Sequence, residues 1–495
     1  MTGPRTAQNT TPSPTGIAAD GATAWMASEC DGVKGRISRL NTRLTDMSLP
    51  GHTTPQAEIQ RGLIRDVFAD VWDCQPLHGF MPEAMGGSTE EILATVETVA
   101  YHHLPMALSM AINGVLFLLP VGQYAESRVR DEVMSRFSGS DVVLGGMMMT
   151  EPHCGTDLFA AKTTAKRGAT STRIRGEKHW SGLTGHADYW MVFARDEEAG
   201  RRDRFAFHVA SADDPGFKVS EYYEACGLCP IPYGRTQVDI ELPNDARIGK
   251  GAAYSSVVAG ILQRSRLISG GVAHGFARRV LTEARNYAES RTAFGEPLAR
   301  LDQVAYRLER IQFTELMARA MLSYAANSVG TLHQPVPESR GCSRTIKALA
   351  TGLMVDASDH LSMIQGAHGF RRTTMGLSAL TDAHPFRIFE GPNDVLFDQG
   401  ACDDLRRAKG QSLGEMLSGH QFTPSTSTLA SLLDRGVEDL PQRDRVVLGR
   451  MIALADAMCW MSEAVCFSDE ELELAARHAE ADMARMAVTL EMTTA

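Results

Sequence analysis

The sequence predicts an α+β protein of several domains, with an all-helical N-terminal domain, a middle β-barrel-like domain, a C-terminal four-helix bundle and a helical C-terminal extension. Apolar residues recur at helical spacing on both sides of a central region, and within that region they alternate at period two. A chain of 495 residues is also longer than one hydrophobic core usually serves. We expect a flexible tail at 1–30 and units at 31–140, 141–248, 249–409 and 410–495.

Composition and charge restrict the classes of function. A formal net charge of −11 argues against nonspecific nucleic-acid binding, because an acidic surface repels phosphates. The first 25 residues lack the apolar core of a signal peptide, so we expect a cytoplasmic protein. The uncharged run at 104–121 contains Pro105, Asn113 and Pro120, which favours a buried helix and turn over a membrane span.

The N-terminal unit is predicted to be helical throughout. Val33, Ile37 and Leu40 recur on one face of a helix. Ser88 stands three residues before Glu91, which is the spacing of a capping box at a helix start.

The middle unit begins near residue 141 and shows strand periodicity. Apolar residues alternate with polar ones at 205–209 and again at 238–242, and Gly and Pro separate these runs. Three consecutive methionines at 147–149 are read either as strand core or as the lining of an acyl pocket.

Long helices are expected after residue 255. Three extended apolar stripes, plus a fourth helix around 370–405, predict a four-helix bundle. Small residues at 269–275 predict close helix packing. Beyond residue 427 we expect two more helices, the second capped by Ser468 and Glu471, forming a hairpin against the bundle or a neighbouring subunit.

The nine cysteines have no repeating spacing, which argues against a disulfide framework. Cys226 and Cys229 form a C-x-x-C pair without a second pair or a histidine pair nearby, so we predict a structural or incidental role and no metal.

One carboxylate has a sequence context that suits acid/base chemistry. Glu390 stands between the apolar pair Ile388–Phe389 and a Gly-Pro turn. A carboxylate held against apolar groups is poorly solvated, which raises its proton affinity and suits a general base. Taken alone, the same residues also fit a surface glutamate that opens a turn.

Four further segments bear on this choice: T-E-P-H-C-G-T-D at 150–157, G-E-K-H-W-S-G at 176–182, R-T-A-F-G at 291–295 followed by Gln303, and G-A-H-G-F at 366–370 leading to F-E-G at 389–391.

In this order and spacing, the segments resemble the acyl-CoA dehydrogenase family, over about residues 31–407. The resemblance implies FAD bound between the β domain and the bundle. Thr150 matches a threonine facing the flavin, Trp180 a tryptophan against its ring, Arg291 and Phe294 residues that reach the FAD of a neighbouring subunit, and Glu390 the catalytic base. It further implies cofactor contacts at Met149, Thr156, Ser181, Gln303, Gly366, Pro392 and Asn393, and substrate contacts at Thr156, Arg266 and Gly391.

Two of these positions also have plain structural readings. Trp180 fits a buried aromatic residue of a sheet, and Arg291 fits a solvated helix residue. The chain also departs from the family pattern. Gly182 and Pro392 stand where threonine is common, and Met363 stands at the place of a glutamine, with Gln365 close by.

The activity implied is α,β-desaturation of an acyl thioester, carried on CoA or on a carrier protein. A base removes the α proton while the β hydride leaves to the flavin. The resemblance also implies an electron-transfer flavoprotein as acceptor and a homodimer or homotetramer. Two alternatives stay open: a flavin oxidase or monooxygenase on the same scaffold, and a catalytically silent binding or assembly protein.

Overall fold

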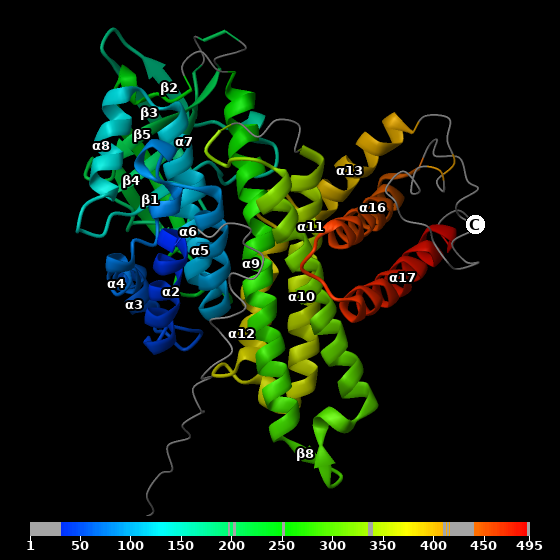
Figure 1. Cartoon of the computed structure of the whole chain (residues 1–495). Helices are drawn as coiled ribbons and strands as arrows, with labels where there is room; N and C mark the ends of the chain where they lie inside the picture. Colours follow the sequence, from blue (N-terminus) through cyan, green and yellow to red (C-terminus); the bar gives the residue numbers. More distant parts are fainter. Residues whose placement is uncertain are drawn as a thin grey trace, which may run out of the picture.

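The computed structural model describes residues 31–196, 199–200, 204–249, 253–334, 340–408, 412, 415 and 440–492. The expected N-terminal tail and most of the expected linker after residue 409 lie outside these ranges. N-terminal helices and a curled sheet form one side of the molecule, long helices form its centre, and the C-terminal helices form the other side (Figure 1). The predicted α+β architecture is confirmed.

The N-terminal unit is helical, as predicted. The apolar face of its first helix is buried at Val33, Ile37 and Leu40. The Ser88 Oγ accepts the Glu91 N–H at 3.2 Å, which confirms half of the capping box; the Glu91 carboxylate instead accepts from Arg36 at 2.5 Å. The helices are α2 (Asp31–Asp46), α3 (Gln56–Gln60), α4 (Leu63–Ala69), α5 (Thr89–His102), α6 (Leu104–Asn113), α7 (Leu119–Tyr124) and α8 (Ser127–Phe137), with a π turn at Gly114–Leu118 between α6 and α7.

Within the described part of the chain, Leu104–Tyr124 is the one helical stretch long and apolar enough to cross a bilayer by length and composition. Its most apolar window is 94% buried in the protein. This stretch is therefore a core element of the fold, as its prolines and Asn113 predict. Asn113 is itself buried, and its Oδ1 accepts the Gly145 N–H at 2.7 Å, which attaches the helix to the first strand.

The middle unit is a seven-stranded sheet in the order β1-β4-β2-β3-β7-β6, with β5 paired to the other side of β4. Strands β1 and β4 run parallel, and β3 and β7 pair antiparallel over the length of β3. The strands are β1 (Gly145–Met148), β2 (Thr164–Arg167), β3 (Ser171–His179), β4 (Tyr189–Arg195), β5 (Phe205–Ser211), β6 (Phe217–Tyr222) and β7 (Gly234–Pro243).

The two period-two patterns in this unit have different outcomes. Strand β7 alternates between buried and solvent-facing residues, as predicted. Strand β5 does not: Ala206 and His208 are buried like the phenylalanines beside them, so the prediction of an alternating strand there is wrong. Both faces of β5 are covered, and the ring of Phe205 stacks on Phe193 at 5.4 Å.

The centre of the molecule is a helical bundle built on α9 (Tyr254–Ser290), α10 (Asp302–Ser328) and α11 (Arg340–Gln365). The predicted fourth helix around 370–405 is divided into α12 (Met375–Ala383) and α13 (Asn393–Arg407). Pro385 lies in the short 3₁₀ turn that follows α12, and Pro392 is the N-cap of α13. Proline removes a backbone donor and disfavours helix in the residue before it, so the chain turns between these two positions.

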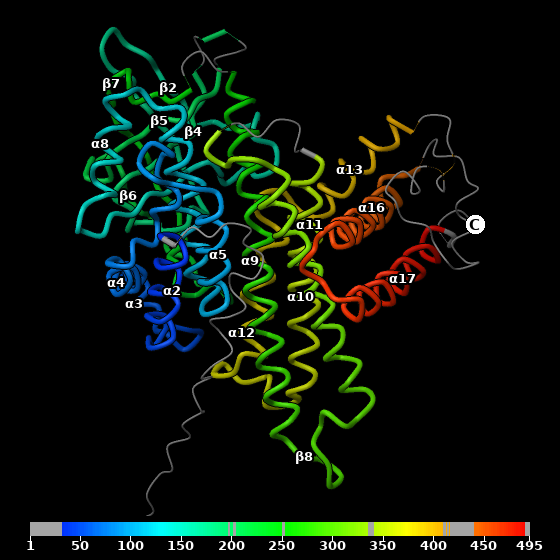
Figure 2. The backbone as a smooth tube through the Cα atoms, viewed as in Figure 1, coloured from blue at the N-terminus to red at the C-terminus, as the bar shows by residue number. Residues whose placement is uncertain are grey.

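Small residues allow α9 to approach its neighbours closely, as predicted. A Cβ atom on Gly275 would lie 1.9 Å from the Glu97 carbonyl of α5, and one on Gly270 would lie 3.1 Å from the Leu322 nitrogen of α10. Helix α9 therefore joins the N-terminal unit to the bundle through backbone contact. The tube view shows α5, α9 and α10 in that sequence across the molecule (Figure 2).

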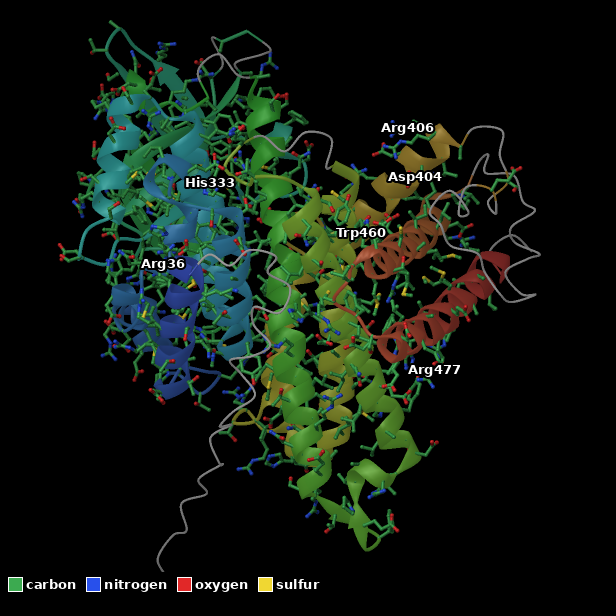
Figure 3. All side chains as sticks on the ribbon, in the orientation of Figure 1. Arg36, His333, Asp404, Arg406, Trp460 and Arg477 are labelled. Carbon is green, nitrogen blue, oxygen red and sulfur yellow. The ribbon has the colours of Figure 1, made fainter. Side chains whose placement is uncertain are left out.

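The two C-terminal helices, α16 (Gln442–Glu463) and α17 (Asp469–Met492), fold as a hairpin against this chain's own bundle. Trp460 of α16, which is labelled in Figure 3, stacks on Tyr324 of α10 with ring centroids 4.1 Å apart. Arg310 of α10 pairs with Asp482 of α17 at 2.9 Å. The sequence left open whether the hairpin packs against this chain's bundle or against a neighbouring subunit, and the described structure shows it against this chain's bundle.

Removing the Ser468 hydroxyl should weaken this hairpin measurably. Both capping-box bonds are present: the Ser468 N–H donates to Glu471 at 2.9 Å and the Glu471 N–H donates to the Ser468 Oγ at 3.3 Å. Ser468→Ala should lower the free energy of unfolding by about 1 kcal/mol. Urea unfolding followed by circular dichroism measures it. Ser462→Ala, which removes a hydroxyl from the last turn of α16, is the control and should be near neutral.

Candidate functional site

Glu390 lies in the turn between the two halves of the divided fourth helix. Its φ is 58° and that of Gly391 is 97°, so two consecutive residues adopt the left-handed conformation. Such a conformation is costly for a residue with a side chain and is typical of functional turns. The residue as a whole is half-buried, but its carboxyl Oε2 is buried and has no hydrogen-bond partner among the described residues.

The surroundings of this carboxyl differ from the sequence prediction. Ile388 is 57% exposed, so the expectation that Ile388 shields the carboxylate is wrong. The groups that interact with the carboxyl are Ser265 and Arg266 of α9 and Lys347 of α11. The Arg266 Nε donates to the Glu390 carbonyl at 2.9 Å, which fixes the backbone of the turn.

Burial raises the pKa of Glu390 above its ordinary value of 4.5, while Arg266, Lys347 and the Ser265 hydroxyl act in the opposite direction. The carboxyl is therefore a stronger base than a solvated one. It still has cations close enough to stabilise its ionised form. Both properties suit a group that removes a weakly acidic proton.

Lys347 is a candidate site residue that the sequence did not single out. It is 1% exposed, and its Nζ donates to the Gly391 carbonyl at 2.6 Å and to Asn393 Oδ1 at 2.8 Å. Burial lowers its pKa to about 7; Glu390 opposes this shift and Arg266 adds to it. The only signal in the sequence was a lysine inside the apolar stripe of α11, which periodicity does not connect to a turn more than forty residues away.

Asn393 and Pro392 are positioned by this network. Asn393 is 8% exposed; its Oδ1 accepts from Lys347, and its Nδ2 donates to the Ala348 carbonyl at 2.8 Å. The Asn393 side chain thus stabilises the turn through internal hydrogen bonds, and its two polar atoms already have partners other than a cofactor. Pro392 precedes it as the N-cap of α13. Gly391 lies against Arg266: a Cβ there would be 3.2 Å from the guanidinium.

Trp180 lies at the edge of the β domain in a conformation that presents its ring. Its φ is 55°, its N–H donates to the Gly234 carbonyl at 3.0 Å, and 53% of the residue is exposed. It is therefore not the buried sheet aromatic that was the structural alternative. Tyr223 and Tyr233 pack beside it, with ring centroids 4.6 and 5.9 Å away. Ser181, the next residue, is 6% exposed.

A buried ion pair holds the segment that carries Met149 and Thr150. Lys178 Nζ lies 2.8 Å from Glu151 Oε1 and 3.2 Å from the Met149 carbonyl, and the side chains of both Lys178 and Glu151 are almost completely inaccessible. Glu151 also accepts the backbone N–H groups of residues 162 and 163, and His153 Nε2 lies 3.4 Å from its Oε2. Because its oxygens are occupied, the nearby His153 and Cys154 do not make a convincing metal site with it. Thr156 lies in the exposed part of the same loop.

The remaining predicted residues lie at the other end of the bundle. Arg291 directly follows α9, and Phe294 is 95% exposed at the tip of the β8–β9 hairpin (Thr292–Ala293 and Glu296–Pro297). At 1.5 Å per residue, Arg291 is roughly 37 Å along α9 from Arg266. The hairpin projects from the bundle, away from the sheet (Figure 1). These two residues therefore do not join Glu390 or Trp180 within one chain.

Gly366 and Gln303 are at this far end as well. Tyr287, four residues before Arg291, donates through its hydroxyl to the Gln365 carbonyl at 3.2 Å, so Gly366 follows directly beside the end of α9. Gln303 is exposed in the first turn of α10. Gln365 itself is buried and bonds to Glu283 and to the Gly376 N–H, whereas Met363 is 55% exposed.

Two family models match the chain: "Acyl-CoA dehydrogenase, middle domain" over residues 146–240 and "Acyl-CoA dehydrogenase, C-terminal domain" over residues 255–402. The human mitochondrial short-chain specific acyl-CoA dehydrogenase is 24% identical over 320 residues, which is 64% of this chain and 76% of that protein. A glutaryl-CoA dehydrogenase of Desulfococcus multivorans is 26% identical over 309 residues, 61% of this chain and 76% of its own.

A solved acyl-CoA dehydrogenase from Bacillus anthracis, complexed with FAD, has the same fold, with a TM-score of 0.74 at 17% identity. The match covers 94% of this chain and 88% of that one. This share is larger than residues 1–409 alone supply, so the likeness continues into the C-terminal helices.

Proposed function

The chain belongs to the acyl-CoA dehydrogenase family, and from this premise we propose that it is an FAD-dependent oxidoreductase that desaturates an acyl thioester between its α and β carbons. The observation that carries the proposal is the Glu390 carboxyl, whose Oε2 is buried and unpartnered at the turn between α12 and α13. A buried polar atom normally has a partner, so an orphaned one at a strained turn is a group that awaits a ligand.

The residues present fit a flavin. Trp180 offers a half-exposed indole, braced by two tyrosines, to a planar aromatic ring. Burial raises the pKa of Tyr233, and the nearby Asp382 carboxylate of α12 raises it further, which shows that Tyr233 lies close to α12. The indole is therefore at the boundary between the β domain and the helices that lead to Glu390. Thr150 is held at the same edge by the Lys178–Glu151 pair.

When bound, FAD accepts a hydride from the β carbon of the substrate. This chain's residues perform the other half of the reaction. Glu390 Oε2 takes the α proton, and its raised pKa lets it hold that proton. The Glu390 N–H has no acceptor among the described residues and is available to polarise the thioester carbonyl, where negative charge develops. Arg266 holds the Glu390 carbonyl and Lys347 the Gly391 carbonyl, so the turn is rigid before substrate arrives.

The experiment that tests this proposal is anaerobic mixing of the flavin-loaded protein with acyl-CoA thioesters of increasing chain length. Loss of the oxidised flavin absorbance together with a trans-2-enoyl product supports it. Absence of bleaching with every thioester, in protein that retains FAD, overturns it. The same series with acyl groups on a carrier protein decides which carrier is used. Peroxide formation in air would instead identify an oxidase.

The finer parts of the proposal follow the resemblance. We propose an electron-transfer flavoprotein as the acceptor, a cytoplasmic location, and a homodimer or homotetramer in which Arg291, Phe294, Gln303 and Gly366 serve the flavin of a neighbouring copy. The position of Arg291 supports the last point, since it lies roughly 37 Å along α9 from Arg266, which contacts the Glu390 turn.

Neutralising Lys347 should shift the pH dependence of flavin reduction. Glu390 must be ionised to act, and Lys347 is charged below about pH 7, where it favours that ionised form. Lys347→Gln keeps a donor for the Gly391 carbonyl but removes the charge, so the pKa of Glu390 should rise. The acid limb of the single-turnover profile should then move up by about one pH unit.

Lys218→Gln, on the exposed side of β6, is the matched control for this shift and should leave the profile in place. An acid limb at the same pH in Lys347→Gln and the parent protein would show that the lysine charge does not act on the base.

A further inference from the structure

A second group of reactive side chains lies away from Glu390 and involves Cys229. His52, in the loop after α2, places its Nε2 3.0 Å from Asp382 Oδ1 and its Nδ1 3.8 Å from the Cys229 sulfur. A thiol, an imidazole and a carboxylate thus follow one another in the order that nucleophilic cysteines require. The three residues come from three separate parts of the chain, so the C-x-x-C spacing gave no sign of this group.

Each member of the group is held in place by further contacts. The Asp382 Oδ1 also accepts the Leu228 N–H at 2.5 Å, which ties the cysteine loop to the end of α12. The loop is pressed closely against this helix, since a Cβ on Gly227 would lie 2.1 Å from the Thr381 carbonyl. On the other side, His103 Nε2 lies 2.6 Å from the Pro50 carbonyl and fixes the loop that carries His52.

The charge on the imidazole favours a reactive sulfur. Burial alone would lower the pKa of His52, but the hydrogen bonds to Asp382 and Cys229 raise it to about 10. The ring is therefore an imidazolium at neutral pH, and an imidazolium beside a cysteine sulfur is the arrangement found at nucleophilic cysteines. The other close contact of the thiol is the Ala225 carbonyl at 3.5 Å. His103 and Tyr233 are the other titratable groups that interact with this carboxylate and imidazole.

The group adjoins a cleft. His52, Pro230 and Asp382 line this cleft, whose volume is about 400 Å³, and the half-buried Cys229 precedes Pro230 at its edge without being one of the lining residues. Its walls combine apolar side chains, such as Leu104 and Phe276, with two guanidinium groups, Arg279 and Arg372. Arg279 also lies 3.9 Å from Glu283 of its own helix. A cleft whose walls carry both apolar and cationic groups suits an acyl chain attached to an anionic carrier.

We propose that Cys229 is an acyl-accepting nucleophile, oriented by His52 and Asp382, that takes the acyl group of a thioester by thiol–thioester exchange. The Cys229 sulfur bonds to the carbonyl carbon, the carbon–sulfur bond of the substrate breaks, and the leaving thiolate takes the proton from His52. One thioester replaces another, so no oxidant or reductant is consumed. The choice of a thioester as donor rests on the proposed function, whereas the activation of the thiol does not.

The test uses the full-length protein and two probes. Iodoacetamide at pH 6.5, with peptide mass spectrometry, gives the alkylation rates of Cys229 and of Cys226, the more exposed thiol in the same loop. Cys229 should react roughly tenfold faster than Cys226, and His52→Gln should abolish the difference. His186→Gln is the control and should retain the difference, because the described contact of the His186 Nε2 is with the Gln60 carbonyl and not with this group. Equal rates in the parent protein, or a Cys226 that reacts faster, would overturn the activation of Cys229.

The second probe is butyryl-N-acetylcysteamine, a small thioester. Cys229 should gain one butyryl group that hydroxylamine removes, Cys229→Ser should gain none there, and Cys226→Ser should be acylated as the parent is. An unacylated Cys229 would overturn the acyl-acceptor role. All samples carry Glu390→Gln as well, so a failure here is independent of flavin reduction. The Cys226 rate and the melting temperature of each variant report whether His52→Gln remains folded.

Discussion

Glu390→Gln should lower the rate of flavin reduction by acyl thioester by roughly 10³-fold or more while the protein stays folded and retains FAD. Glutamine has the same shape but cannot accept the α proton. The substitution should be tolerated because Oε2 has no hydrogen-bond partner among the described residues, and the glutamine side-chain carbonyl can still accept from the Ser265 hydroxyl. Anaerobic stopped-flow absorbance at saturating thioester measures the rate, and the visible spectrum before mixing measures the flavin content.

Asp394→Asn provides the matched comparison, since it neutralises an exposed carboxylate four residues further along, in the first turn of α13. Its rate should stay within about twofold of the parent, as is usual for a solvated side chain. A Glu390→Gln protein that is reduced at a rate within tenfold of the parent would mean that another group takes the proton, and the assignment of the base would have to be abandoned.

Lys178→Met should destabilise the protein by about 3–5 kcal/mol, because it leaves the Glu151 carboxylate buried without its cation. Burial would raise the pKa of Glu151, but the Lys178 charge and the hydrogen bonds from Lys178, Lys162 and Thr163 hold it below its ordinary value. In the parent, Glu151 therefore contributes stability above the unfolded pKa that is lost as pH falls. In the variant the buried, unpaired Glu151 carboxylate destabilises the folded state, and its protonation at low pH removes this destabilisation.

The difference in the free energy of unfolding between the parent and Lys178→Met should therefore narrow as the pH falls from 7 toward 4. Urea midpoints from tryptophan fluorescence measure it, because buried Trp190 reports on the same sheet. Adding Glu151→Gln should recover part of the loss by removing the uncompensated charge. Lys166→Met, on an exposed position of β2, should cost less than about 0.5 kcal/mol. A loss as small as this in Lys178→Met would refute the argument.

Much of the fold could be predicted from the sequence because helical and strand periodicities are local. The buried face of α2, the alternation of β7 and the cap of α17 all depend on residues within one element. The errors have equally local causes. Strand β5 is covered on both faces by its neighbours, and the proline-containing turns at 385 and 392 divide a helix that the apolar stripe predicted as continuous.

The candidate site was only partly predictable because its contacts join distant segments. The position of Glu390 followed from the motif, but its contacts did not. Arg266, which donates to the Glu390 carbonyl, is 124 residues away, and the predicted neighbour Ile388 faces solvent. Periodicity also gives no means to pair Lys347 with Gly391. The His52–Asp382 contact spans 330 residues, which no reading of local pattern connects.

The length of α9 has a consequence for how the protein behaves on dilution. The helix runs from Tyr254 to Ser290 and separates the Glu390 end of the bundle from Arg291 and the exposed ring of Phe294. If those two residues bind a flavin, that flavin belongs to another copy of the chain. Dissociation of the copies would then also release the coenzyme. Apparent affinity for FAD would then depend on protein concentration, and a very dilute preparation would become colourless without any chain unfolding.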